Sequence, residues 1–394
     1  MVFKVKNISI IKALFVWCFF CSIVLALVYN ITDTKINLLF VKDLVILIFL
    51  VIVFNLALKV NRFSFFSILF FSYLFVSSIF SDAPLMAKAA SIRQMVIPFV
   101  LVFIGVFLGK GTNLIKAKRV ALKIGFVVLI LGIFELALSI WHHINITGYF
   151  DVKNIPVYNL SYKNLYYYPV FFIEPILGGL KRMTSTMLDP INLGHTFAFL
   201  LSMVFFEDGI IKKQVNKYWL AFLFSISLIL TFSKGAILQV IIIVLLMNSK
   251  LSRGIKVLII LVLSLILVYF SKFHAGVLKH LEGLISAISN LNLFGHGLGK
   301  TGNQAFMFGE PTIKIGDTFF GAIIGQLGLM GYILWILPFY YIIKCLNVNL
   351  VSKIFIAQIF ISLISENSFN LLSIFLVCIF IGMEYKQKLS ISNA

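Results

Sequence analysis

Long runs of hydrophobic residues recur from one end of this chain to the other. A helix needs about 20 apolar residues to cross the hydrocarbon core of a bilayer. The chain is therefore expected to be an all-α, polytopic membrane helical bundle, forming a single domain over residues 1–394. About twelve spans are predicted, at 9–28, 38–58, 63–80, 94–109, 122–141, 190–206, 217–232, 235–248, 256–270, 318–343, 350–364 and 370–384. The pairs within 217–248 and 350–384 each leave open one long bent helix.

The composition supports a membrane class. Hydrophobic residues make up 61% of the chain and charged residues 12%, whereas a soluble protein is nearer half apolar and a quarter charged. The first apolar run lacks a convincing cleavage site, so we interpret it as a retained helix. Cys18 and Cys21 lie inside that run and are interpreted as small apolar residues, not as a redox pair.

The charge pattern predicts the orientation. Lys and Arg number 33 against 14 acids, and most of them gather in alternate short loops and at both termini. Such loops stay cytoplasmic, so both termini are expected in the cytoplasm. The net charge of +19 is then a topology signal that also attracts anionic lipid. No soluble basic domain suggests a nucleic-acid partner.

Two long loops, 142–189 and 271–317, are predicted on the outward, periplasmic side. Long loops on a scaffold commonly carry function. The second loop contains FGHGLGKTG at 294–302. A phosphate-binding loop requires a glycine five residues before the second one, and this place is taken by Phe294. We expect the glycines to let the loop turn tightly, without nucleotide binding.

A candidate anion site lies around the sixth span. Arg182 precedes Asp189 and Pro190, which suit the cap and first turn of a helix. Asn192 and His195 are three residues apart and share one face of that helix. A helix N-terminus beside an arginine can bind an anion, although a capped helix with an interfacial arginine is the plainer alternative.

Further ionisable residues are predicted at the same outward level. Lys234 occupies the turn between two spans, Arg93 starts the fourth span, and Lys300 lies in the second long loop. Such cations suit the pyrophosphate of a lipid carrier. Asp317 starts the tenth span, either as a cap or as a base. Glu135 falls within a span, where a basic partner is expected. No metal-binding motif is evident.

Three blocks resemble the bacterial O-antigen polymerase and ligase superfamily, which includes the Wzy-type polymerases. They are RMTSTMLDPINLGHTFAFLL, LTFSKGAILQVIIIVLL, and the stretch from GHGLGKTG through GDTFFGAIIGQLGLMGYILWIL. The blocks cover roughly 180–340, whereas the first half matches only in hydropathy and at Arg93. Two departures matter: Lys234 stands where the family usually has arginine, and Asp317–Thr318 replaces a His-Asn pair typical of ligases.

The resemblance implies a polymerase at the periplasmic face of the inner membrane. It would transfer an undecaprenyl-pyrophosphate-linked glycan, for O-antigen or capsule, to a sugar hydroxyl of the next lipid-linked repeat unit. Arg182 and Lys234 would hold the pyrophosphate with help from Arg93. Asp317 would be the general base, with His195 or His296 as a fallback.

The implied reaction also predicts cofactors and partners. Neither a metal nor a cofactor is needed, because the donor carries its own leaving group. A chain-length regulator protein is an expected partner, and the loop and glycan side of the site would include Asn192, His296 and Lys300. Two alternatives stay open. One is the ligase that moves glycan to lipid A core, and the other is a flippase for lipid-linked oligosaccharide.

Overall fold

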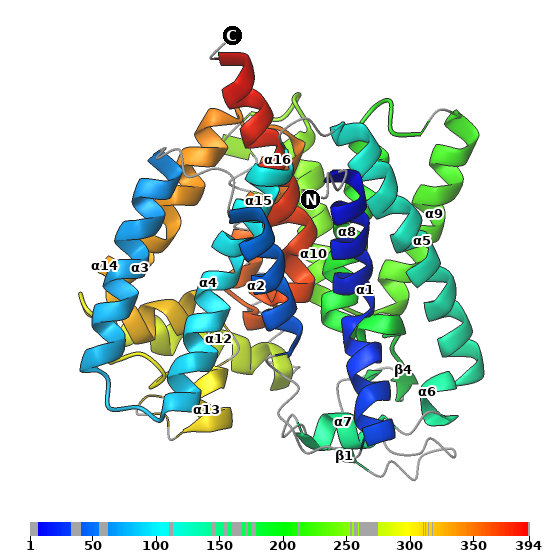
Figure 1. The fold of residues 1–394 in the computed structure, drawn as a ribbon. Helices are drawn as coiled ribbons and strands as arrows, with labels where there is room; N and C mark the ends of the chain where they lie inside the picture. Colours follow the sequence, from blue (N-terminus) through cyan, green and yellow to red (C-terminus); the bar gives the residue numbers. More distant parts are fainter. Residues whose placement is uncertain are drawn as a thin grey trace, which may run out of the picture. The chain divides into compact units, whose positions relative to one another are not determined.

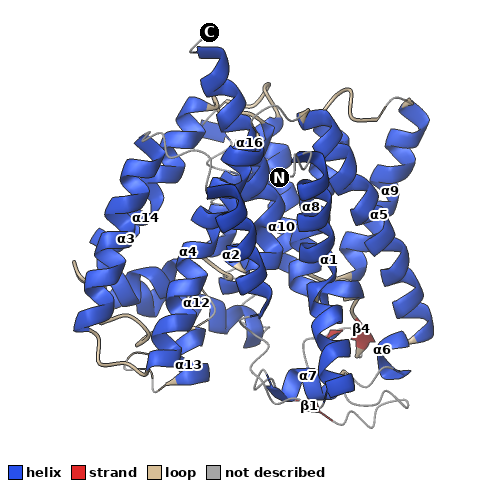
Figure 2. Ribbon diagram, in the orientation of Figure 1, coloured by secondary structure: helices blue, strands red, loops and turns tan. Residues whose placement is uncertain are grey.

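The structure is a computed structural model, and its described residues are mainly helical (Figure 2). These residues are 7–32, 41–54, 62–109, 113–143, 146–152, 157–158, 168–169, 172–174, 179–211, 213–252, 254–255, 259, 275–309, 311, 313, 315–316 and 318–392. The chain forms two compact units. Unit 1 comprises Met1–Leu56 and Ile104–Ile237, and unit 2 comprises Ala57–Phe103 and Leu238–Ala394.

The expectation of a helical protein with membrane-spanning character is confirmed at this level. Among the described residues, five helices are long and apolar enough to cross a membrane. They are α1 (Asn7–Thr32), α3 (Arg62–Phe80), α4 (Leu85–Leu108), α5 (Leu114–Leu138) and α14 (Phe319–Cys345). Each predicted span overlaps a described helix except 256–270, which lies outside the described residues apart from position 259.

Unit 1 is built from α1, α5 and a set of shorter elements (Figure 1). Two antiparallel strand pairs, β1 with β2 and β3 with β4, precede the short 3-10 helix η4. The remaining elements of the unit are α2 (Val41–Phe54), α6 (Ile140–His143), α7 (Thr147–Val152), β1 (Val157–Tyr158), β2 (Tyr168–Pro169), β3 (Ile173–Glu174), β4 (Leu180–Lys181), η4 (Ser185–Met187), α8 (Pro190–Phe206) and α9 (Gln214–Leu230). Helices α4 and α10 (Lys234–Met247) each have residues in both units.

The η4 segment is held between α1 and α5. The Ser185 hydroxyl donates to the Val128 carbonyl of α5 at 2.6 Å, and the Thr186 hydroxyl donates to the Phe19 carbonyl of α1 at 2.7 Å. All four of these residues are buried or nearly so, and each hydroxyl satisfies its hydrogen bond inside the protein. This anchoring fixes the start of α8, which follows η4 directly.

Unit 2 contains α3 and α14 packed side by side, together with most of α4 and the C-terminal helices (Figure 1). Its other elements are α12 (Ala275–Ser289), α13 (Asn303–Phe308), α15 (Leu350–Ser362), η5 (Glu366–Phe369) and α16 (Leu371–Ser392). Aromatic rings fill its core, with centroids 4.6 Å apart for Phe319 and Phe369 and 4.7 Å apart for Phe99 and Phe339.

Helix α14 is broken in its first half by Gly328, whose φ of 70° and ψ of −172° are not helical. The backbone around the break pairs with the glycine-rich segment before it. The amide of His296 donates to the Gly325 carbonyl at 2.8 Å, and the amide of Leu329 donates to the Asn292 carbonyl at 3.0 Å. The expected tight turns of this segment are confirmed, because Gly295, Gly297, Gly299 and Gly302 all have positive φ.

Two predicted helix starts were wrong, those of α4 and α5. Helix α4 begins at Leu85, nine residues before the predicted start, so Arg93 lies within the helix and not at its start. The Lys88 ammonium donates to the Ser78 and Ser81 carbonyls at 3.3 and 2.9 Å, so this charged side chain is satisfied within the first turn of the helix. The predicted loop 271–317 contains helices α12 and α13. The segments 217–248 and 350–384 are each two helices, since α9 ends at Leu230 and α15 at Ser362.

Candidate functional site

Arg182 lies at the end of the β3–β4 hairpin in unit 1. Its backbone amide donates to the Phe172 carbonyl at 2.7 Å. Its guanidinium crosses to the turn between α9 and α10, where Nε donates to the Thr231 carbonyl at 2.8 Å and Nη2 to the Phe232 carbonyl at 3.4 Å. Only 8% of the residue is exposed. The arginine therefore fastens the hairpin to the turn.

The turn itself is strained and well hydrogen-bonded. Phe232 has a φ of 49°, which is unusual for a residue other than glycine. The Thr231 hydroxyl accepts the Ser233 amide at 3.2 Å and donates to the Leu228 carbonyl at 2.6 Å. These bonds separate α9 from α10 and leave the carbonyls of Thr231 and Phe232 directed to Arg182.

Lys234 is the first residue of α10 and reaches back to the same hairpin. Its ammonium lies 3.1 Å from the Glu174 carboxylate on β3. The Lys234 side chain is 53% exposed, whereas that of Glu174 is 7% exposed. Arg182 and Lys234 are 52 positions apart in sequence, yet the structure brings both to one hairpin and one turn. We call the set Arg182, Lys234 and Glu174 the basic turn site.

Helix α8 begins beside this site. The Asp189 carboxylate accepts the Ile191 and Asn192 amides at 2.8 and 3.2 Å, and Pro190 occupies the first position, so the predicted cap is confirmed. The Asn192 side chain donates to the same carboxylate at 2.9 Å. A Cβ at Gly194 would lie 2.6 Å from the Ser233 Cβ, so only glycine allows α8 to pack this closely on the turn.

The charges of the basic turn site are partly balanced. Burial lowers the pKa of the Arg182 guanidinium, and the Asp189 and Glu174 carboxylates oppose this shift. Glu174 is already a partner of Lys234, so an incoming anion at Lys234 competes with a resident carboxylate. The arrangement suits reversible binding of a strongly charged anion, because a diphosphate carries more negative charge than one carboxylate.

His195 is completely buried in α8. It shares the helix face of Asn192, as its spacing predicted, but burial favours a structural role over contact with a substrate. Asp317 lies outside the described residues. The neighbouring Thr318 caps α14, with its hydroxyl accepting the Gly321 amide at 3.1 Å.

The other predicted residues belong to unit 2. Arg93 is half-buried in α4. His296 Nε2 lies 2.9 Å from the Asn290 carbonyl. Lys300 forms an ion pair with Asp82, and its ammonium lowers the pKa of the Asp82 carboxyl. Lys300 is therefore held by a carboxylate in the same unit.

The sequence analysis missed three polar residues that organise these regions. Glu174 and Lys181 lie on strands of two residues, too short to leave a periodic signal. Lys181 is the expected partner of Glu135, at 2.5 Å between Nζ and Oε1. In unit 2, the Gln326 side chain accepts the Gly299 amide at 2.7 Å and donates to the Thr301 carbonyl at 2.9 Å.

Comparison with known proteins finds no match to a family model, a curated protein or a solved structure.

Proposed function

We propose that this chain is a polymerase of lipid-linked polysaccharide, acting on an undecaprenyl-pyrophosphate-linked glycan. The observation that supports it most is the basic turn site, where Arg182 and Lys234 come from distant segments to one hairpin. A diphosphate tether needs converging cations of this kind. The proposal includes about twelve spans in the bacterial inner membrane, with both termini in the cytoplasm and the basic turn site facing the periplasm.

In this proposal Lys234 and Arg182 have different tasks. Lys234 is the more exposed cation, and it leaves Glu174 to contact the diphosphate. Arg182 is nearly enclosed, so it holds the hairpin on the turn and adds positive charge beneath the anion. Both charges favour bond breaking, because negative charge develops on the departing diphosphate.

The reaction itself is a transfer between two lipid-linked glycans. A sugar hydroxyl of the acceptor attacks the anomeric carbon of the donor, and the bond from that carbon to the diphosphate oxygen breaks. The hydroxyl proton passes to a base, for which Asp317 is proposed and His296 is the fallback. Arg93, Asn192 and Lys300 are proposed to assist in binding, and a chain-length regulator is a proposed partner.

The test uses a strain lacking this gene, complemented by variants expressed at equal membrane levels. Lys234→Ala should lower transfer about 10²-fold, leaving single repeat units on lipid A core in place of a ladder. Lys234→Arg should restore the ladder, because arginine keeps the charge. Lys213→Ala is the matched control, since Lys213 is an exposed lysine at the start of α9 outside the basic turn site.

The outcome separates the proposal from its rivals. A ladder of normal length with Lys234→Ala would remove the basic turn site from the reaction. In the gene-deletion strain, loss of all glycan from lipid A core with lipid-linked polymer accumulating would favour a ligase. Accumulation of lipid-linked units on the cytoplasmic face would favour a flippase.

A further inference from the structure

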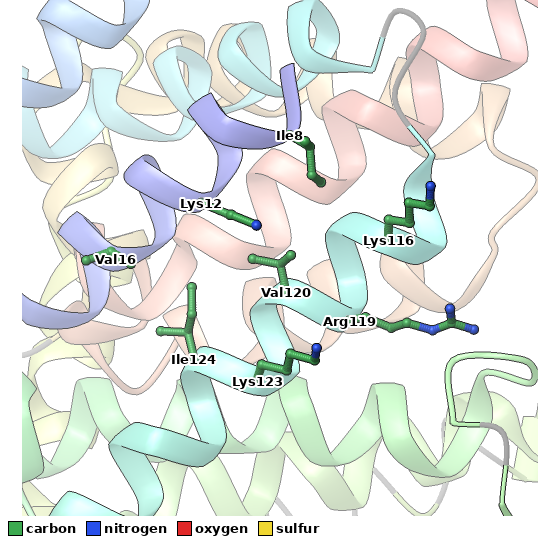
Figure 3. A pocket seen from close by; sticks show the side chains of 8 residues that line it. All are labelled: Ile8, Lys12, Val16, Lys116, Arg119, Val120, Lys123 and Ile124. Atoms are coloured by element: carbon green, nitrogen blue, oxygen red, sulfur yellow. The ribbon is translucent and has the colours of Figure 1, made fainter. Parts of the chain in front are cut away.

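A second basic feature lies at the opposite end of α5 from the Glu135–Lys181 pair. A groove of about 440 Å³ runs between α1 and α5 in unit 1 (Figure 3). Four of its lining residues are basic: Lys12 from α1, and Lys116, Arg119 and Lys123 from α5. The groove starts near position 116 of α5, about 28 Å along the helix from Glu135 at 1.5 Å per residue. It is thus separate from the basic turn site.

The other lining residues are aliphatic and follow helical spacing. Ile8 and Val16 stand one turn before and after Lys12 on α1, and Val120 and Ile124 follow Lys116 on α5. Each helix therefore presents basic and aliphatic side chains on the same face. Figure 3 shows Lys12 extending from α1 toward α5. This combination matches an amphiphile with an anionic head, not a small inorganic ion alone.

Within the described part of the chain, acidic side chains leave the positive charge of this groove largely uncompensated. Lys12, Lys116 and Lys123 are exposed and form no ion pair within the described part of the chain. Arg119 donates to the Ile210 and Gly209 carbonyls, each at 2.8 Å, which fixes it without neutralising it. The neighbouring Lys118 differs, because it is buried and lies 2.5 Å from the Glu207 carboxylate. Among the described residues, the side of α5 that carries Lys118 is therefore paired with a carboxylate, and the groove side is not.

We infer that this groove binds the headgroup of an anionic phospholipid. The phosphate would sit among the ammonium groups of Lys12, Lys116 and Lys123, and the acyl chains would follow the aliphatic residues toward the middle of α1 and α5. Basic pockets between membrane helices recognise such headgroups, and the mutual repulsion of the lysines falls when an anion lies between them. The inference uses the membrane-spanning character of α1 and α5 and not the proposed enzymatic activity.

The experiment measures thermal unfolding of the purified, delipidated full-length protein in neutral detergent. Titrating phosphatidylglycerol should raise Tm by about 2–4 °C, whereas phosphatidylcholine should not. The double variant Lys12→Gln/Lys123→Gln should lose most of that increase. The control variant Lys213→Gln/Lys250→Gln removes the same charge from two exposed lysines outside the groove and should keep it.

Two further measurements make the result decisive. Native mass spectrometry should show one or more retained phosphatidylglycerol molecules on the wild-type protein and fewer on the groove variant, whatever the effect on Tm. Inorganic phosphate at the same phosphorus concentration should give no increase in Tm. Equal stabilisation by phosphate, or equal lipid retention by the groove and control variants, would overturn the inference.

Discussion

At the scale of single residues, the Glu135–Lys181 pair is a buried ionic contact within the apolar part of unit 1. Glu135 is fully buried and Lys181 is 10% exposed. The Lys181 ammonium also donates to the Glu135 carbonyl at 3.1 Å and to the Ser139 hydroxyl at 3.4 Å. It therefore joins the end of α5 to strand β4, next to Arg182.

Replacing Lys181 alone should lower the stability of the protein more than replacing both members of the pair. Lys181→Met leaves a buried carboxylate without its ammonium, which costs about 3–5 kcal/mol. The double variant Glu135→Gln/Lys181→Met removes both charges and should recover most of that loss. Thermal unfolding in detergent measures both variants. A double variant as unstable as Lys181→Met would show that the pair does not act as a unit.

The chemistry of this pair was only half predictable. A carboxylate inside an apolar run indicates a basic partner, because an unpaired charge there is costly. The identity of Lys181 depends on a hairpin that returns the chain to α5, and sequence spacing does not encode that return. The same holds for Glu174, which meets Lys234 only after the hairpin has formed.

At the scale of elements, the break in α14 shows where a helical pattern hides irregular backbone. The sequence around Gly328 is as apolar as the rest of the helix. Gly331 allows close packing on α3, since a Cβ there would lie 3.1 Å from the Tyr73 ring. Gly328 instead has a backbone conformation open to glycine alone, and its neighbours bond the glycine-rich segment.

Gly328→Ala should destabilise unit 2 by more than backbone strain alone. A Cβ at this position would lie 2.4 Å from the Gly295 amide nitrogen and 2.4 Å from the Leu293 carbonyl oxygen. We expect a loss above about 3 kcal/mol. Gly209→Ala is the matched control, because Gly209 also has positive φ but its Cβ would meet nothing within 4 Å. That variant should lose about 1–2 kcal/mol. Equal losses in thermal unfolding would mean that the clash relaxes freely.

Helix positions were predicted better than helix ends. The range 190–206 matches α8 because Asp189 and Pro190 mark its start clearly. The start of α5 was placed eight residues too late, since Lys116, Lys118, Arg119 and Lys123 resemble a loop by hydropathy. Asn113 caps the helix there by accepting the Lys116 amide at 3.0 Å. Helix caps and carbonyl partners can therefore stabilise basic residues within a helix, where the hydropathy pattern predicts a loop.

At the scale of the whole molecule, the proposed glycan transfer depends on which membrane face each end of the chain meets. The predicted orientation comes from Lys and Arg in short loops. It puts the α10 end at Asn248–Ser252 in the cytoplasm and the α12 end at Asn290 in the periplasm. The native cysteines suit a labelling test, because Cys18, Cys21 and Cys378 are buried and only Cys345 is partly exposed.

In a Cys345→Ser background, single cysteines at Lys250 and Asn290 should react on opposite sides. Both positions are exposed in the structure, so accessibility to reagent reports the membrane face and not burial. An impermeant maleimide added to intact cells should label Asn290→Cys, and should label Lys250→Cys only after the inner membrane is opened. The reverse pattern would place the predicted outward loops in the cytoplasm, away from periplasmic glycan transfer. The lipid groove would still be testable, because anionic phospholipid binding to α1 and α5 does not depend on that side.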